Sequence, residues 1–182
     1  MQPVFAPEFI GDFFSLHIHQ TKNHTQIDMQ VLPNLINTAS LPNTYNILSS
    51  RLPSVNTSLC FNDKKLPFAK EVKRTETGHL FEHILLEHIY QRKVACGHKD
   101  VCVKGETSWN WHKFPTGFFS ITINIGRKER DILEQALIPS IQLLQFIFAF
   151  HSKNHAGVKS VPILGKNITP SAMLSMFATE KS

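Results

Sequence analysis

Long apolar runs, a cysteine framework and clustered charge are all missing from this sequence of 182 residues. No stretch approaches the roughly 18 consecutive apolar residues that a membrane-spanning helix requires. Residues 1–8 lack the basic region and the long apolar stretch of a secretory signal. We therefore expect no membrane partner and a cytoplasmic location.

Cysteine is scarce, and the count is odd, because Cys60, Cys96 and Cys102 are the only three. An odd count argues against a disulfide framework and suits a reducing compartment. The formal net charge of +5 comes from scattered Lys and Arg residues. The sequence shows no arginine-rich stripe and no basic and aromatic platform of the kind that nucleic-acid-binding modules carry. We therefore expect no nucleic-acid partner.

The length suits a single domain, residues 1–182, with a sizeable core. Alternating or β-branched patterns predict strands at residues 13–21, 26–31, 101–103 and 117–125. Apolar periodicity and start signals predict helices at residues 44–52, 77–92 and 129–150, the last with a possible kink at Pro139, and a short helix from Thr169. Residues 104–116 read as a long hairpin loop. The expected fold class is α+β, with an antiparallel sheet packed against helices.

The segment His79-Leu80-Phe81-Glu82-His83 carries the strongest chemical signal. Histidines four apart lie about one turn apart on one face of a helix, so both imidazoles can reach a single metal ion. Glu82 lies beside them, where a carboxylate can hold a metal-bound water as general base. This order reverses the more common His-Glu-x-x-His motif and is typical of inverzincins. Core histidines paired with a neighbouring carboxylate are the alternative interpretation.

The apolar residues around this motif indicate a deeply buried helix. Leu80, Phe81, Ile84, Leu85 and Ile89 spread around most of the helical circumference. The polar residues of the motif then fall on one narrow strip. Buried polar groups need partners, and a metal ion with its water would supply them.

A second group of ligand-type residues follows this helix. Cys96, His98 and Cys102 lie close together, and thiolate with imidazole is a set of ligands that zinc accepts. Only three ligands are present, and their spacing is not a standard one. The group is either a structural zinc site or part of an ordinary loop.

Two tryptophans, Trp109 and Trp111, lie in the predicted hairpin loop. They can line a substrate groove or a dimer contact. They can equally anchor a long hairpin onto the core. The sequence leaves both interpretations open.

The motif helix resembles part of a known protein family. Residues 68–87 are similar to the N-terminal domain of cyanophycin synthetases, which has a Gly-His-x-x-Glu-His helix and a further Glu four residues after the second His. In this sequence the matching positions are Gly78, His79, Glu82, His83 and Glu87. The similarity extends upstream through Leu52-Pro53-Ser54 to Cys60, and downstream through residues 105–107 to the strand that opens at Gly117. It covers about residues 12–146.

The resemblance implies an activity. The N-terminal domain of cyanophycin synthetases resembles insulinase-type metallopeptidases, and in some members it is a zinc-dependent endopeptidase that trims the polymer to make primers. The ATP-grasp and Mur-ligase-like modules of these synthetases cannot fit into 182 residues, which excludes ligation. We therefore expect a zinc-dependent peptidase or amidase, with Zn²⁺ as cofactor and a peptide or isopeptide, such as a cyanophycin-like polymer, as substrate.

Two further expectations come from the same resemblance. A non-catalytic module of the same fold, which binds a peptide-like polymer or a protein partner, is the alternative to an enzyme. Insulinase-type sites often lie between two related domains. A lone domain can build such a site by forming a homodimer.

The resemblance also implies roles for the motif residues. His79 and His83 would bind zinc, and Glu82 would be the general base. In insulinase-type enzymes a Glu from a later helix is the third ligand, yet residues 135–179 contain no Asp or Glu. The expectation therefore falls on Glu180, at the end of the last predicted helix.

Other residues compete for the role of third ligand. Glu134 lies on a firmer helix, although by chain order this is the wrong helix. Glu87 lies one turn beyond His83, and three successive turns seldom converge on one tetrahedral ion, which favours a role behind the ligands. His151 and His155 are further candidates, and a pseudoenzyme without a third ligand is the remaining option.

Overall fold

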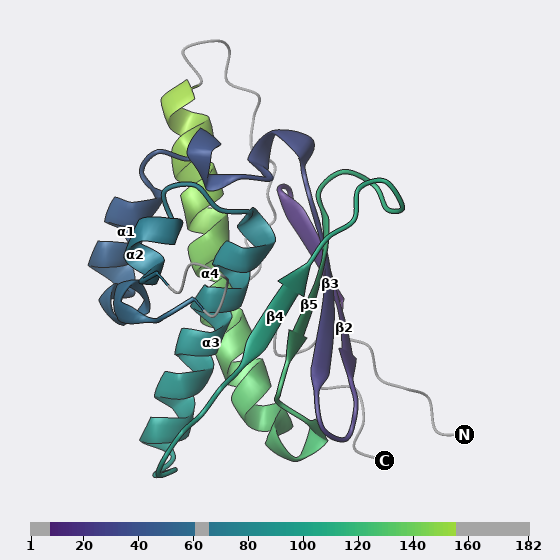
Figure 1. Cartoon of the computed structure of the whole chain (residues 1–182), viewed down its shortest axis with the longest axis vertical. Helices are drawn as coiled ribbons and strands as arrows, with labels where there is room; N and C mark the ends of the chain where they lie inside the picture. The colour runs from purple at the N-terminus through teal and green to yellow at the C-terminus, as the bar shows by residue number, and fades with distance from the viewer. Residues whose placement is uncertain (1–7, 61–65, 156–182) are drawn as a thin grey trace.

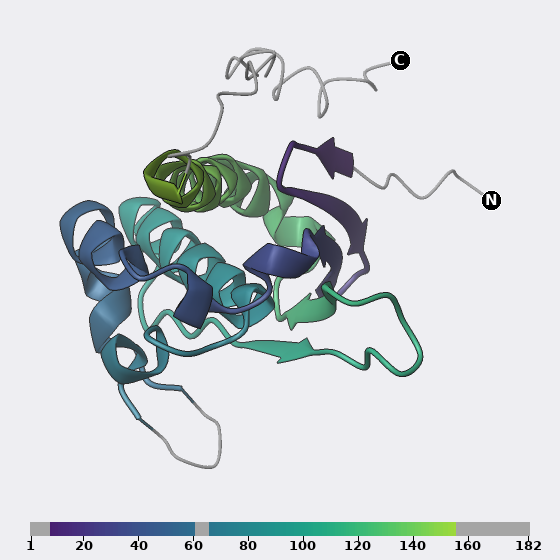
Figure 2. The same ribbon diagram turned by 90° about the horizontal axis from the view of Figure 1, so that it is seen from above.

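The structure, a computed structural model, describes residues 8–60 and 66–155. Five antiparallel strands form one sheet, and the helices lie on one side of it (Figures 1 and 2). The strands in spatial order are β1 (Glu8–Ile10), β2 (Phe14–Gln20), β3 (Thr25–Val31), β5 (Phe118–Ile123) and β4 (Gly105–Ser108). The expected α+β class is confirmed.

The helical layer contains four α-helices and several short 3₁₀ turns among the described residues. The α-helices are α1 (Thr44–Arg51), α2 (Phe68–Glu71), α3 (Thr77–Ala95) and α4 (Arg130–His155). The 3₁₀ turns are Pro33–Leu35, Thr38–Ser40, Pro53–Thr57 and Arg127–Glu129. Helices α3 and α4 pack against each other and cover the sheet, while α1 and α2 lie on the far side of α3 (Figure 1).

The two faces of the sheet differ because side chains alternate along each strand. Leu16, Ile27 and Phe119 face the helices and are fully buried. His17 and Asp28 lie opposite each other on β2 and β3, on the face away from the helices. The hydrophobic core therefore lies between the sheet and α3 with α4.

Helix α3 is buried on nearly all sides from Thr77 to Ile89, as its sequence predicted, and its last turns are mostly exposed. Leu80, Phe81 and Ile84 have no exposed surface. Close approach to the sheet also depends on Gly78, because a Cβ atom at this position would lie 2.5 Å from Cγ of Phe119 on β5. A larger residue would push the start of the motif helix away from the sheet.

Helix α4 and the turn before it are long and apolar enough, by length and composition alone, to cross a membrane. Half of the most apolar stretch is buried inside the fold. A core helix of a soluble protein meets the same criteria, so this is weak evidence for a membrane span. The helix continues through Pro139 to His155.

Two expectations about strands differ from the structure. Residues 101–103 form no strand, and β4 lies instead at Gly105–Ser108, within the predicted loop. The pairing begins where Lys104 and Asn124 exchange hydrogen bonds, and it continues along β5. Strand β1 was not predicted. Three residues are too short for an alternating pattern to be recognised.

Candidate metal centre

Three side chains bring metal-ligating atoms together at the start of α3. Cys60, His79 and His83 place Sγ and ring nitrogens within 4.8 Å of one another. The Nε2 atoms of His79 and His83 are 3.1 Å apart, and Sγ of Cys60 lies 3.5 Å from Nε2 of His83. This group could hold a metal ion.

The distances match those around a tetrahedral ion. With zinc–nitrogen bonds of about 2.05 Å and a zinc–sulfur bond of about 2.3 Å, tetrahedral angles put two nitrogens about 3.3 Å apart, and nitrogen and sulfur about 3.6 Å apart. The observed separations are 3.1 and 3.5 Å. Two of the three separations therefore match a tetrahedral ion, and the third, between Sγ of Cys60 and His79, lies within 4.8 Å.

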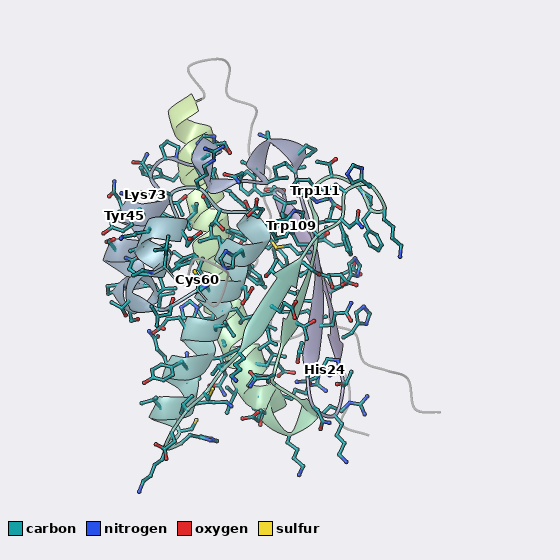
Figure 3. All side chains as sticks on the ribbon, viewed as in Figure 1. His24, Tyr45, Cys60, Lys73, Trp109 and Trp111 are labelled. Carbon is teal, nitrogen blue, oxygen red and sulfur yellow. The ribbon has the colours of Figure 1, made fainter. Side chains whose placement is uncertain are left out.

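The sequence did not identify Cys60 as a ligand, although the family resemblance included it. Cys60 precedes both α2 and α3 in the chain, and Figure 3 shows it within the helical layer. Leu59 forms a β-bridge with Pro67, and the amide of Cys60 donates to the carbonyl of Leu66 at 3.1 Å. No local spacing signals this placement, because it depends on the chain path between residues 60 and 79.

Hydroxyl groups form hydrogen bonds with the Nδ1 atoms of both imidazoles. Oγ of Ser58 lies 3.0 Å from Nδ1 of His83, and Oγ1 of Thr75 lies 2.8 Å from Nδ1 of His79. Metal-binding histidines usually have such a partner on the nitrogen that does not bind the metal. The two contacts turn both Nε2 atoms toward the same point.

Burial keeps both imidazoles neutral. It lowers the pKa of His83 to about 3, and neighbouring His79 lowers it further. Burial also lowers the pKa of His79, although Glu71 and Glu76 partly oppose this. Neutral imidazoles have the lone pairs that a metal requires.

The thiol of Cys60 is protonated at neutral pH when no metal is bound. Burial raises its pKa to about 11, and the charges of Glu71 and Glu82 add to the shift. A thiol must lose its proton to become a metal ligand. Metal binding at this group would therefore be coupled to proton release.

Glu82 is buried but is not part of the ligand group. The hydroxyl of Thr107 on β4 donates to its Oε2, and a Cβ at Gly105 would lie 2.8 Å from its Oε1. Burial raises the pKa of Glu82 to about 7, the hydrogen bond from Thr107 lowers it, and Glu106 raises it. A carboxyl group with this pKa can both accept and donate a proton near neutral pH.

The structure does not bring the described alternative carboxylates to the histidines. Glu87 accepts hydrogen bonds from Ser54 and Gln91, and Glu134 pairs with Arg130 at 2.6 Å. Neither belongs to the group of ligand atoms around the two histidines. Both competing carboxylates thus have other partners.

Three other candidates for the third ligand remain, Glu180, His151 and His155. Glu180 and the helix predicted from Thr169 lie outside the described residues, and so does the side chain of His155. His151 lines a small hollow between α1 and α4. Among the described residues, Cys60 is the third member of the group.

Cys96, His98 and Cys102 do not converge on one point in the described part of the chain. Among the described residues their ligand atoms form no group like that of Cys60, and all three residues are exposed. They lie in the segment that follows α3, around a turn in which Gly97 and Asp100 have positive φ. The ordinary-loop interpretation is the one that agrees with this placement.

The two tryptophans lie where the loop leaves β4 (Figure 3). Nε1 of Trp111 donates to the carbonyl of Phe118 at 3.1 Å, and its ring packs edge-on against Phe119. Trp111 therefore anchors the loop. Trp109 also meets Phe119 edge-on but is 43% exposed.

Comparison with known protein families finds no family that matches the sequence. Comparison with curated proteins finds no match.

Proposed function

We propose that this chain is a zinc-dependent hydrolase that cleaves amide bonds in a peptide or isopeptide. The observation that carries the proposal is the convergence of Cys60, His79 and His83. Thiolate and imidazole ligands favour zinc over magnesium or calcium, which prefer oxygen ligands. Three protein ligands leave a fourth position open, as in catalytic zinc sites.

The chemistry divides between a bound ion and Glu82. Zinc, when bound, lowers the pKa of a water molecule and polarises a carbonyl oxygen. Glu82 would accept a proton from the attacking water and deliver it to the leaving amine. Two observations support this role: its pKa near 7, and its charge, which lies close enough to Cys60 to raise the pKa of the thiol.

The position of β4 at the edge of the sheet suits the binding of a peptide substrate. This strand lies at the edge of the sheet and carries Thr107, the hydrogen-bond partner of Glu82. An extended peptide can add to such an edge through main-chain hydrogen bonds. Trp109 follows β4 directly and offers an exposed aromatic surface for a substrate side chain. The resemblance to cyanophycin synthetases suggests a cyanophycin-like polymer.

The contact between Cys60 and His83 could instead be a catalytic dyad with a cysteine nucleophile. Such a dyad needs a thiolate, usually stabilised by a charged imidazole. Here burial raises the pKa of Cys60 to about 11 and lowers that of His83 to about 3. Both groups are therefore neutral, which disfavours nucleophilic catalysis and favours metal binding.

A non-catalytic module is the second candidate, and one observation favours it. The carboxylate of Glu82 is held between Thr107 and Gly105 of β4, in the interface between the helix and the sheet. If the carboxylate remains there when metal is bound, the ion stabilises the fold without hydrolysis. The hydrolase needs Glu82 for turnover, whereas the non-catalytic module has no turnover with or without Glu82.

The experiment measures metal content and hydrolysis together. Protein purified without added metal is expected to contain about one zinc per chain. The variants Cys60→Ala and His79→Ala should lose it, whereas the exposed-cysteine control Cys96→Ala should retain it. Glu82→Gln should keep zinc but lose hydrolysis of cyanophycin or of a peptide library. A metal-free wild type contradicts the proposal, and zinc without any hydrolysis favours the module.

A further inference from the structure

Residues 54–60, the segment that carries the candidate thiol ligand, are fastened to α3 at two points. Oγ of Ser54 lies 2.6 Å from Oε1 of Glu87, and Oγ of Ser58 lies 3.0 Å from Nδ1 of His83. Glu87 and His83 are one helical turn apart, which places the two contacts about 6 Å apart along the axis of α3. A segment held at two separate points cannot pivot freely on the helix.

The first of these contacts is a hydrogen bond to a carboxylate. A carboxylate has no hydrogen to donate, so the hydroxyl of Ser54 donates to Glu87. Gln91, one turn further along α3, donates through Nε2 to Oε1 of Glu87 at 3.0 Å and to Oγ of Ser54 at 3.3 Å. Hydrogen bonds to a charged acceptor are shorter and stronger than neutral ones. Glu87 therefore joins the segment to α3 through a connected group of three side chains.

Apolar packing holds only part of this segment. Of residues 54–60, only Val55 and Cys60 are buried, and Leu59 is 55% exposed. At the end of the segment, the amide of Cys60 donates to the carbonyl of Leu66 at 3.1 Å, which is a contact with a neighbouring part of the chain and not with α3. The polar contacts with α3 therefore contribute a large share of what places the segment on the helix.

The position of the segment sets how Cys60 meets His83. Ser58 and Cys60 approach opposite nitrogens of the same imidazole, with Oγ 3.0 Å from Nδ1 and Sγ 3.5 Å from Nε2. The contact of Ser58 joins the two residues whichever of them donates the hydrogen. Because Ser58 and Cys60 are two residues apart, a shift of the segment along α3 moves both contacts together.

We propose that Glu87 is a positioning residue, which holds residues 54–60 on α3 and so sets the distance between the thiol of Cys60 and His83. The inference rests on the proposed metal centre and goes beyond it by giving Glu87 a role there. Glu87 acts through Ser54 and does not bind the ion.

The reactivity of Cys60 tests the position of the segment without any metal. In a Cys96→Ser/Cys102→Ser background Cys60 is the one remaining thiol. In the presence of a chelator it must leave its buried position to react with a disulfide reagent such as DTNB. Glu87→Ala should raise the rate of this reaction roughly tenfold. The matched control Glu134→Ala removes another half-buried glutamate with a partner at 2.6 Å, and it should leave the rate unchanged.

Two further variants separate positioning from a general loss of stability. Glu87→Gln keeps an oxygen that can accept from Ser54, so its thiol should react nearly as slowly as that of the parent. Ser54→Ala removes the other partner and should react as fast as Glu87→Ala. Combining Ser54→Ala with Glu87→Ala should add little, because both remove the same contact. Equal rates in Glu87→Ala and the parent, or fully additive effects of the two substitutions, overturn the proposal.

Zinc affinity, measured by competition with a chromophoric chelator, tests the consequence for the metal centre. Glu87→Ala should bind zinc roughly tenfold more weakly than the wild type, and Glu134→Ala should bind it equally well. Equal zinc affinities in Glu87→Ala and the wild type contradict a role of Glu87 at the centre. If the wild type binds no zinc while the thiol rates change as expected, the proposed function fails, and the control of the Cys60 position by Glu87 is supported.

Discussion

The ring of Phe68 stacks on the imidazole of His83, with ring centroids 4.0 Å apart and planes inclined by 14°. Phe68 is fully buried, and it also meets His79 edge-on at 5.8 Å. One aromatic side chain therefore contacts both histidines. Because its position restricts how either ring can turn, Phe68 links the packing of the core to the geometry of the candidate metal centre.

Replacement of Phe68 should reduce stability and metal affinity together. Phe68→Ala leaves a cavity and is expected to lower the free energy of unfolding by about 3–5 kcal/mol, measured by urea denaturation. Zinc affinity should fall as well, since both imidazoles gain freedom. Val94→Ala, at a residue that is 48% exposed, is the control and should change stability by about 0.5 kcal/mol or less. Similar losses in both variants would contradict this account.

The buried carboxyl of Glu82 should make metal-free protein less stable at higher pH. Its pKa is raised to about 7 in the folded protein, from 4.5. Its stabilising contribution is thus complete below about pH 4.5 and is lost as the pH rises through 7. The variant Glu82→Gln lacks this titration. Between pH 5 and 8 the wild type should lose up to about 3 kcal/mol relative to the variant, in the presence of a chelator.

The lowered pKa values of His79, His83 and His88 make the folded protein more stable as the pH rises. These shifts occur in both wild type and Glu82→Gln, so they largely cancel when the two stabilities are compared. Thr107→Val provides a second check. Its hydroxyl holds the pKa of Glu82 down, so its removal should move the transition to higher pH. A difference between wild type and Glu82→Gln that does not vary with pH would show that the carboxyl titrates normally.

Zinc binding should release about one proton per ion near pH 7. The thiol of Cys60 has its pKa raised to about 11 and must lose its proton to bind, whereas both imidazoles are already neutral. Calorimetric titrations in buffers of different ionisation enthalpy measure this number. Cys60→Ala should bind zinc more weakly and release no proton. Release of a proton by that variant would point to a different source.

Gly78 should not tolerate a side chain. A Cβ atom there would lie 2.5 Å from Cγ of Phe119, and the start of α3 would have to move. Gly78→Ala is expected to cost about 1–3 kcal/mol of unfolding free energy. At Gly105 the nearest atoms to an added Cβ belong to the unbranched side chain of Glu82 and not to a core ring, so Gly105→Ala should cost less stability but alter the pH dependence attributed to Glu82. Equal stability losses in the two variants would contradict this distinction.

The sequence predicted the parts of the fold that depend on local patterns. Helix α3 was recognised because apolar residues surround its polar strip, and strands β2 and β3 because their side chains alternate. The same residues placed His79 and His83 on one face, and the structure brings their Nε2 atoms to 3.1 Å. Both predictions need only the geometry of a single element.

The sequence did not predict features that depend on pairing between distant segments. Strand β4, Gly-Glu-Thr-Ser, has little intrinsic tendency to form a strand, and its conformation comes from pairing with β5. Val101 and Val103 suggested a strand in the wrong place. Cys60 joins the histidines because Leu59 bridges to Pro67, a contact that no spacing rule predicts.

The β-bridge between Leu59 and Pro67 bears on protein engineering. The contacts of Leu59 with Pro67 and of Cys60 with Leu66 close the chain at the two ends of residues 61–65. These contacts hold the backbone of Cys60 directly. We expect a peptide tag inserted between residues 61 and 65 to leave Cys60 in place beside His79 and His83, because the paired residues on either side hold it there.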